Sequence, residues 1–456
     1  MTWLLRVLAC ATAALAPVEG YLLEVHGQLA KVTPALLVVA WVAARARQRR
    51  MPAAHPVHVV LALLFVVLLG TTAVHAGGPY AVDYLQRWLP FLVVTVVLVD
   101  VAAREVPIRA LLASVVAGAA VAAVGALHSL VAEGATRATG PVEDPNDLAY
   151  FLVAALPLLV ALTDGRRAGS AGPAGSARQG GPVRSRGRWA WSVRWARSVR
   201  WARPVRWARF GGPARSIGLA VTGLVLVVGA AATFSRGGAL ALSAAVAWLV
   251  VRRALPVRAV LAGAAAVVVL GVGVVLFAAP TLDRAVREKS HIAETNVDTR
   301  GLRWQAAARM VAAHPVLGVG PGGFRDGYAA ASHNAESDEQ TPVAHNMYLE
   351  VAAELGLAGF AAFLGLPVVA AVCSERVLRS GAPPLRPGGP PSDRCGFGGA
   401  GARRPVVAVQ ASLIAVVVAS TFLSQQYYLP LWSLVAVVAA ADLRRRGTDA
   451  CAPRHQ

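Results

Sequence analysis

The sequence predicts an all-α polytopic membrane protein with about twelve transmembrane helices. Hydrophobic residues make up 56% of the 456 residues, and the mean hydropathy is +0.55. Charged residues make up only 15%, whereas a soluble domain has about 25%. Apolar stretches long enough to cross a bilayer, which takes about 20 residues, recur along the whole chain. These observations exclude an ordinary soluble protein.

The candidate spans are twelve apolar stretches separated by polar or glycine-rich loops. The first is the weakest, because Arg6 interrupts it and a signal peptide is a rival interpretation. No small-x-small cleavage site followed by a soluble domain is present, so we retain it as a span. The twelve stretches lie near residues 1–18, 28–45, 56–76, 85–103, 109–131, 147–163, 216–234, 237–252, 256–279, 346–374, 405–424 and 427–442.

Arginine is concentrated in every second loop, which predicts the orientation of the spans. Basic loops of bacterial membrane proteins stay in the cytoplasm, so we expect a multi-pass protein of the cytoplasmic membrane with both termini cytoplasmic. Nucleic-acid binding is the competing explanation of the net charge of +20, but helices are expected to interrupt every basic run. The basic clusters are Arg45 to Arg50, Arg104 with Arg109, residues 164–215, Arg252 with Arg253 and Arg258, residues 376–404, and Arg444 to Arg446.

The spans and loops divide the chain into five parts. One loop contains the hexads SVRWAR, SVRWAR and PVRWAR, which indicate either a segment lying on the anionic inner leaflet or a short-repeat expansion in a tolerant loop. The expected parts are a six-span bundle at 1–163, this cytoplasmic Arg/Trp-rich loop at 164–215, a core at 216–375, a cytoplasmic Gly/Pro-rich linker at 376–404, and two spans with a basic tail at 405–456. Within the core we expect a large extracytoplasmic loop at 280–345, partly helical at 300–313.

Arg236 is the first candidate functional residue. It lies in AAATFSRGGALALSAA, next to Ser235 and two glycines. An arginine at the centre of a membrane helix costs about 3 kcal/mol, and intramembrane charges are functional by default. The glycines leave room for a large headgroup. The alternative is an interfacial arginine whose charge reaches the water.

Arg300 and Arg303 lie on neighbouring parts of one face of the expected helix. Arginine presents a planar set of donors that matches phosphate oxygens, and it stays charged at any physiological pH. The alternative is ion pairing with Asp298 or with the acidic run Glu336, Asp338 and Glu339. This alternative is stronger for Arg303 than for Arg300.

His345 stands at the start of the apolar segment AHNMYLEVAAELGLAG. An imidazole can accept a proton near neutral pH, as a general base must. A metal site with His333, Asp338 and Glu339 is disfavoured by the irregular spacing. Deeper in the same segment, the carboxyl group of Glu354 is costly to bury in a membrane helix.

Four motifs occur in a fixed order on the expected outer face: SRGG, R-x-x-x-W from Arg300 to Trp304, HPVLGVGPGGF, and AHNMYLEVAAELGLAG. In that order they resemble the O-antigen ligase / O-antigen polymerase superfamily, and the upstream DPNDLA is similar to a further element of that family. The resemblance is strongest over residues 140–160 and 225–375. The Arg/Trp repeat loop is not a family feature.

The resemblance implies a glycosyltransferase that uses a polyprenyl (undecaprenyl) diphosphate donor, with neither a metal nor another cofactor. Direct displacement of the diphosphate predicts inversion at the anomeric carbon. Arg236 and Arg300 then resemble the diphosphate-binding arginines, and His345 the base that activates an acceptor hydroxyl. The acceptor is a glycan, a lipid or a protein, and membrane lipids surround the protein. Further expected substrate-binding residues are Asn346, which would orient the acceptor, and Arg303, Asn146, Asp147, Ser235 and Glu354.

Two other classes of function remain open from the sequence. One is a transporter of a small solute such as bicarbonate, and the other is a non-catalytic membrane scaffold. A carrier needs polar groups near the bilayer midplane and broken helices, whereas the enzyme needs Arg236, Arg300 and His345 at one outward site. The choice between a ligase and a polymerase of a surface polysaccharide is also open.

Overall fold

A computed structural model describes residues 1–163 except 133, 136 and 143, and residues 213–265, 268–269, 299–380 except 337 and 338, and 403–450. Within these ranges every regular element is a helix. The Arg/Trp hexads, most of the Gly/Pro-rich linker, Asp298 and Asp338 lie outside the described residues. The all-α prediction is confirmed for the part of the chain that is described.

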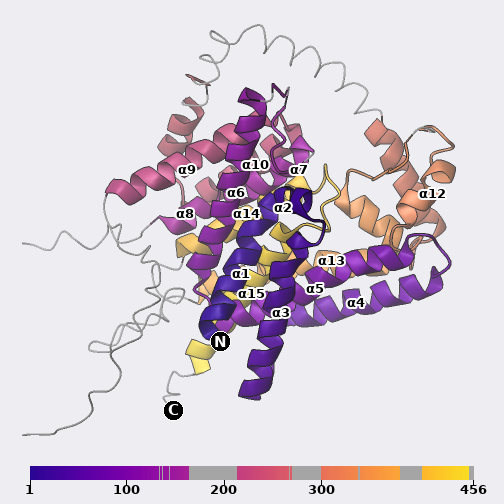
Figure 1. Ribbon diagram of the computed structural model, residues 1–456, viewed down its shortest axis with the longest axis horizontal. Helices are drawn as coiled ribbons and strands as arrows, with labels where there is room; N and C mark the ends of the chain where they lie inside the picture. The colour runs from indigo at the N-terminus through magenta and orange to yellow at the C-terminus, as the bar shows by residue number, and fades with distance from the viewer. Residues whose placement is uncertain are drawn as a thin grey trace, which may run out of the picture.

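From α1 to α6 the helices follow one another along the chain with short connections (Figure 1). Residues 257–265 and 299–313 are also helical. The labelled elements are α1 (Thr2–Leu15), η1 (Ala16–Val18), α2 (Glu19–Val25), α3 (Leu29–Gln48), α4 (Pro56–Val74), α5 (Ala81–Arg104), α6 (Ile108–Val131), α7 (Pro145–Ala155), α8 (Leu158–Leu162), α9 (Pro213–Ala232), α10 (Arg236–Val251), α12 (Gly323–Ala331), α13 (Met347–Arg379), α14 (Arg403–Ala419) and α15 (Leu429–Ala450).

Eight helical segments in the described ranges are long and apolar enough to cross a membrane. Each lies over one of the twelve predicted stretches. Among the other predicted spans, the helix at 237–252 is apolar but shorter, and 256–279 is described only in part. The eight segments are Thr2–Val25, Leu29–Gln48, Pro56–Val74, Ala81–Arg104, Ile108–Val131, Pro145–Leu162, Ala214–Ala232 and Met347–Arg379.

The described arginine clusters gather at one end of the helix bundle. The buried Arg45 bonds to Asp100 at 2.5 Å and to Glu105 at 2.8 Å, which joins the ends of α3 and α5. Arg252, after α10, pairs with Glu375 near the end of α13 at 2.8 Å. Paired charges of this kind lower the cost of burying an arginine. Contacts thus bring together basic helix ends that are far apart in sequence.

The opposite end of the bundle carries a small helical unit formed by residues 299–346. Its own apolar core includes Ala306, Met310, Phe324 and Tyr328, and it packs against Ala353 of α13. In Figure 1 this unit, which contains α12, lies beside the turn between α4 and α5. It is therefore anchored on the membrane bundle at the end where α13 begins.

Helix α13 is broken at Gly356, where φ is +64° and ψ is −173°. The glycine-rich segment after the 299–313 helix fills the break: Val319 N–H donates to Ala353 O at 2.9 Å, and Leu357 N–H donates to Pro315 O at 2.8 Å. A Cβ on Gly356 would lie 2.3 Å from the carbonyl oxygen of Val316. Glycine is needed here because two backbones meet.

Replacing Gly356 with alanine should therefore destabilise the protein by more than about 1 kcal/mol, because a side chain is strained at positive φ and also clashes. Thermal unfolding in detergent measures this. Gly218→Ala is the matched control, since a Cβ there meets nothing within 4 Å. Equal melting temperatures for the two variants would contradict the packing described.

Candidate active site at the start of helix α13

His345 immediately precedes the cap of α13, and its backbone is in the left-handed region with φ of +48°. The cap is Asn346, whose Oδ1 accepts from Tyr348 N–H at 3.1 Å and from Leu349 N–H at 3.2 Å. Few residues other than glycine adopt this conformation without support from their surroundings. The cap fixes the residue at which α13 begins, and it therefore constrains the backbone of His345, which directly precedes the cap.

The peptide groups on both sides of Ala344, the residue before His345, are also held. Ala344 N–H donates to the Glu350 carboxylate at 2.9 Å. The indole N–H of Trp304 donates to Ala344 O at 3.1 Å. Through this bond the tryptophan of the R-x-x-x-W motif joins the helix that carries Arg300 to residues 343–346. These residues are called the base loop below, because they contain the candidate base His345.

Burial and the positive charges of Arg300 and Arg303 lower the pKa of His345 to about 4, and Asp144 and Glu339 offset this only in part. The imidazole is therefore neutral at physiological pH. A neutral imidazole is the form that accepts a proton. Arg300, Asp144 and His345 are thus close enough to influence one another.

Arg303 is engaged by carboxylates. It is 8% exposed and pairs with Glu336 at 3.0 Å and with Glu339 at 2.8 Å. Of the two interpretations weighed for this residue, ion pairing with the acidic run is the arrangement observed. Arg300 differs, because no described residue accepts a hydrogen bond from it.

Arg236 is the first residue of α10 and is exposed. Ser235 caps this helix, its Oγ accepting from Gly238 N–H at 3.2 Å. A Cβ on Gly237 would lie 3.0 Å from Phe422, and one on Gly238 would lie 3.0 Å from Ala149. The two glycines thus permit close packing of α10, and no ion-pair partner for Arg236 occurs among the residues described.

Arg137 was not singled out from the sequence. Its guanidinium donates to Thr233 O at 2.9 and 3.0 Å and to Asn146 Oδ1 at 3.3 Å. Its charge also acts on Arg300. Arg137 therefore links the turn before Arg236 with the start of α7 and with Arg300. The sequence did indicate Arg137, because it is an arginine in a loop on the side of the membrane where the positive-inside rule predicts few arginines.

The DPND segment starts α7. Asp144 caps the helix, accepting from Asn146 N–H at 2.7 Å. Asp147 accepts hydrogen bonds from Gln425 and, at 3.1 Å, from the Tyr428 hydroxyl. Asp147 thereby anchors the loop between α14 and α15, while Asn146 lies beside Arg137.

Glu354 lies two turns along α13 and is 1% exposed. The backbone N–H groups of Gly322 and Phe324 interact with its carboxylate. Its Oε2 has no hydrogen-bond partner among the described residues. Glu354 thus contacts the glycine-rich segment that fills the break at Gly356, and no described hydrogen bond joins it to His345.

The family model for O-antigen ligase matches residues 221–364. The chain is similar to O-antigen ligases over this range. The resemblance noted from the four motifs is confirmed, and the domain contains Arg236, Arg300, Trp304 and His345. No curated protein matches the chain at a significant level.

The site extends beyond the matched O-antigen ligase domain. Arg137, Asp144 and Asn146 precede it, and the loop 420–428 follows it. Met347 N–H donates to Ser420 O at 3.0 Å and to Leu423 O at 2.8 Å, so this loop touches the start of α13 directly. Residues on both sides of the matched range therefore contribute to the candidate site.

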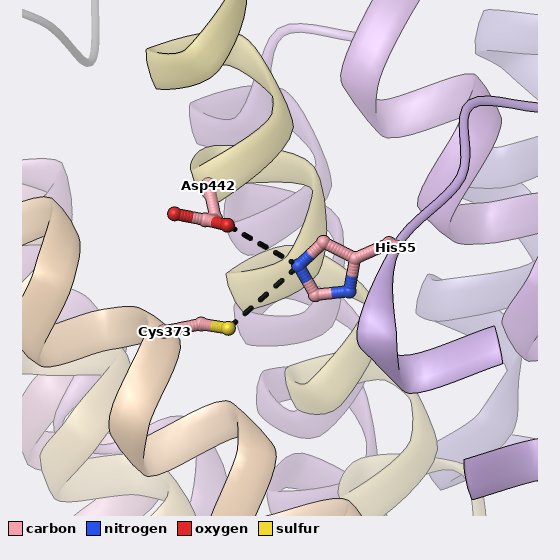
Figure 2. Close-up of side chains that lie close together, drawn as sticks. All are labelled: His55, Cys373 and Asp442. Carbon is pink, nitrogen blue, oxygen red and sulfur yellow. Dashed lines mark hydrogen bonds and ion pairs between the residues drawn. The ribbon is translucent and has the colours of Figure 1, made fainter. Parts of the chain in front are cut away.

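A second buried cluster, also outside the matched range, joins α4, α13 and α15 at the arginine-rich end (Figure 2). His55 Nε2 lies 3.4 Å from Asp442 Oδ2 and 3.7 Å from Cys373 Sγ. These three residue types bind metals elsewhere. The spacing alone would allow a metal ion.

The hydrogen bonds of the cluster do not fit a metal. His55 Nδ1 accepts from Val57 N–H at 3.2 Å, so the ring proton of neutral His55 sits on Nε2, the nitrogen that faces Asp442 and Cys373. A ligating nitrogen must be free of its proton. Asp442 also pairs with Arg445 at 3.1 Å and Arg446 at 2.7 Å. The cluster is a set of buried polar contacts that holds α4, α13 and α15 together.

Asp442→Asn should lower the free energy of unfolding by about 2 kcal/mol, because it breaks a buried, multiply paired carboxylate. Thermal unfolding in detergent measures this. The control is Asp326→Asn, an exposed carboxylate, where a change within about 0.5 kcal/mol is expected. If added zinc raised the melting temperature of the wild type but not of Cys373→Ser, the metal interpretation would replace ours.

Proposed function

We propose that this protein is a glycosyltransferase that moves a glycan from a polyprenyl diphosphate to an acceptor hydroxyl. The observation that carries the proposal is a neutral histidine, His345, beside Arg300 at the mouth of a membrane helix bundle. The O-antigen ligase domain supports the same chemistry. The product is a surface polysaccharide, or a lipid or protein that carries one.

The donor diphosphate is held by Arg236 and Arg300, with Arg137 between them. Each guanidinium offers several N–H donors and a permanent positive charge. Helices α7, α10 and α13 and the 299–313 helix also start in this region, and helix N-termini favour anions. These groups supply the positive charge that a diphosphate leaving group requires, so the reaction needs no metal ion.

His345 removes the proton of the acceptor hydroxyl as its oxygen attacks the anomeric carbon. The bond between that carbon and the diphosphate oxygen breaks, and polyprenyl diphosphate leaves with its charge balanced by the arginines. The proton then passes from His345 to water. A single displacement inverts the configuration at the anomeric carbon.

The arginine-rich end of the bundle faces the cytoplasm in this proposal, as the positive-inside rule requires. The His345 end is then extracytoplasmic, and both termini are cytoplasmic. Solute transport is not favoured, because the break in α13 is closed by backbone hydrogen bonds from residues 315–320. A scaffold role would not explain why His345, Arg300 and Arg137 lie close together.

His345→Ala should lower the turnover number by about 10²–10⁴-fold, since it removes the general base. The measurement is transfer of a labelled lipid-linked oligosaccharide by the purified protein. His314→Ala, an exposed histidine at the end of the 299–313 helix, is the control and should retain wild-type turnover. Full activity in His345→Ala would refute the assigned role.

The pH profile should reflect the lowered pKa of His345, which is about 4. A base must be neutral, so kcat/KM should stay constant down to about pH 5 and fall only below it. Donor binding brings negative charge beside Arg300 and raises the pKa of His345. The acidic limb of kcat should therefore lie at higher pH than that of kcat/KM. A limb of kcat/KM at about pH 6.5, the ordinary histidine pKa, would contradict this account.

A further inference from the structure

Glu350 lies in the first turn of α13 and is 4% exposed. Its carboxylate accepts from Ala344 N–H at 2.9 Å, from the Ser424 hydroxyl, and from the Gln426 side-chain amide at 2.6 Å. No cation pairs with it among the residues described. The carboxylate is instead stabilised by three donors and by the helix N-terminus.

The first of these bonds acts on the base loop. Ala344 precedes His345, and its backbone N–H is held by Glu350 and its backbone carbonyl by Trp304. The left-handed backbone of His345 costs free energy and persists only where neighbouring contacts enforce it. Losing the Glu350 bond would allow this segment to relax and would move the imidazole.

The other two bonds act on the loop between α14 and α15. Gln426 and Ser424 belong to this loop, and so does Gln425, which bonds to Asp147 of α7. The start of α7 lies next to Arg137 through Asn146. One buried carboxylate therefore fixes the base loop relative to the donor-binding side.

We propose that Glu350 is a positioning residue for His345, acting through the Ala344 peptide and the 420–428 loop. This inference rests on the proposed function. Glu350 contacts the backbone before His345, and no hydrogen bond joins its carboxylate to the imidazole in the described part of the chain. Glu350 contributes hydrogen-bond acceptors to this segment, and its negative charge is not needed for turnover.

The test compares Glu350→Leu with Glu350→Gln. Leucine removes the acceptors and should lower kcat by about 10–100-fold, since small misplacements of a catalytic group have effects of this size. The KM for the donor should change by less than about threefold, and the acidic limb of kcat should not move because His345 is still the base. Glutamine should keep kcat within about threefold, because the unpartnered Oε1 of Gln426 can accept from the new amide.

Gln410→Leu is the control for loss of a buried polar network. Gln410 bonds to Ser374 and Glu375 at the other end of α13. This variant should lose stability but keep kcat. If Glu350→Leu does not fold, Gln426→Leu provides the test, because it deletes a donor to the Glu350 carboxylate and should lower kcat without changing KM.

A second readout does not depend on turnover. Carbethoxylation of His345, followed by mass spectrometry, should be faster in Glu350→Leu than in the wild type and unchanged in Glu350→Gln. An unchanged rate in the leucine variant would overturn the positioning role even if no transfer were detected. Wild-type kcat in folded Glu350→Leu, or an inactive Glu350→Gln, would overturn it too. A wild type that transfers no glycan contradicts the proposed function instead.

Discussion

The hydrogen bond from Ala344 N–H to Glu350 is the contact on which the site geometry depends. It folds the residues before α13 back onto the first turn of the same helix. The indole N–H of Trp304 donates to the carbonyl oxygen of the same residue, Ala344. This bond brings the 299–313 helix, and with it Arg300, to His345. The backbone of one residue, Ala344, thus connects the candidate base, the helix that carries Arg300 and the membrane bundle.

The two ends of the bundle use charge in different ways. At the arginine-rich end, carboxylates such as Asp100 and Asp442 are satisfied by several cations, so the charges hold helices together. At the His345 end, Arg303 is satisfied in this manner, whereas Arg236 and Arg300 form no ion pair with any residue that the structure describes. Arginines without carboxylate partners are available for an anionic ligand, which in our proposal is the polyprenyl diphosphate.

Much of the fold was predictable because transmembrane helices are specified by local composition and arginine distribution. His345, Arg300 and Arg236 were also singled out locally, from titratable or charged groups within or beside apolar segments, and their roles stay predictions. Asp144 and Glu350 were not singled out, because their contacts join segments distant in sequence; Arg137 was missed although its place on the arginine-poor side was visible in the sequence. Asn346 and Ser235 turn out to be helix caps, and Gly237 and Gly238, expected to leave space for a headgroup, pack against Phe422 and Ala149.

The most direct test of the account is the stereochemistry of transfer by the purified protein in lipid vesicles. A polyprenyl-diphosphate-linked oligosaccharide of known anomeric configuration is supplied with an acceptor, and the product is analysed by NMR. The account predicts inversion at the anomeric carbon, with one polyprenyl diphosphate released per glycan transferred. Retention of configuration, or glycan transfer without release of the diphosphate, would contradict direct displacement by a hydroxyl that His345 activates.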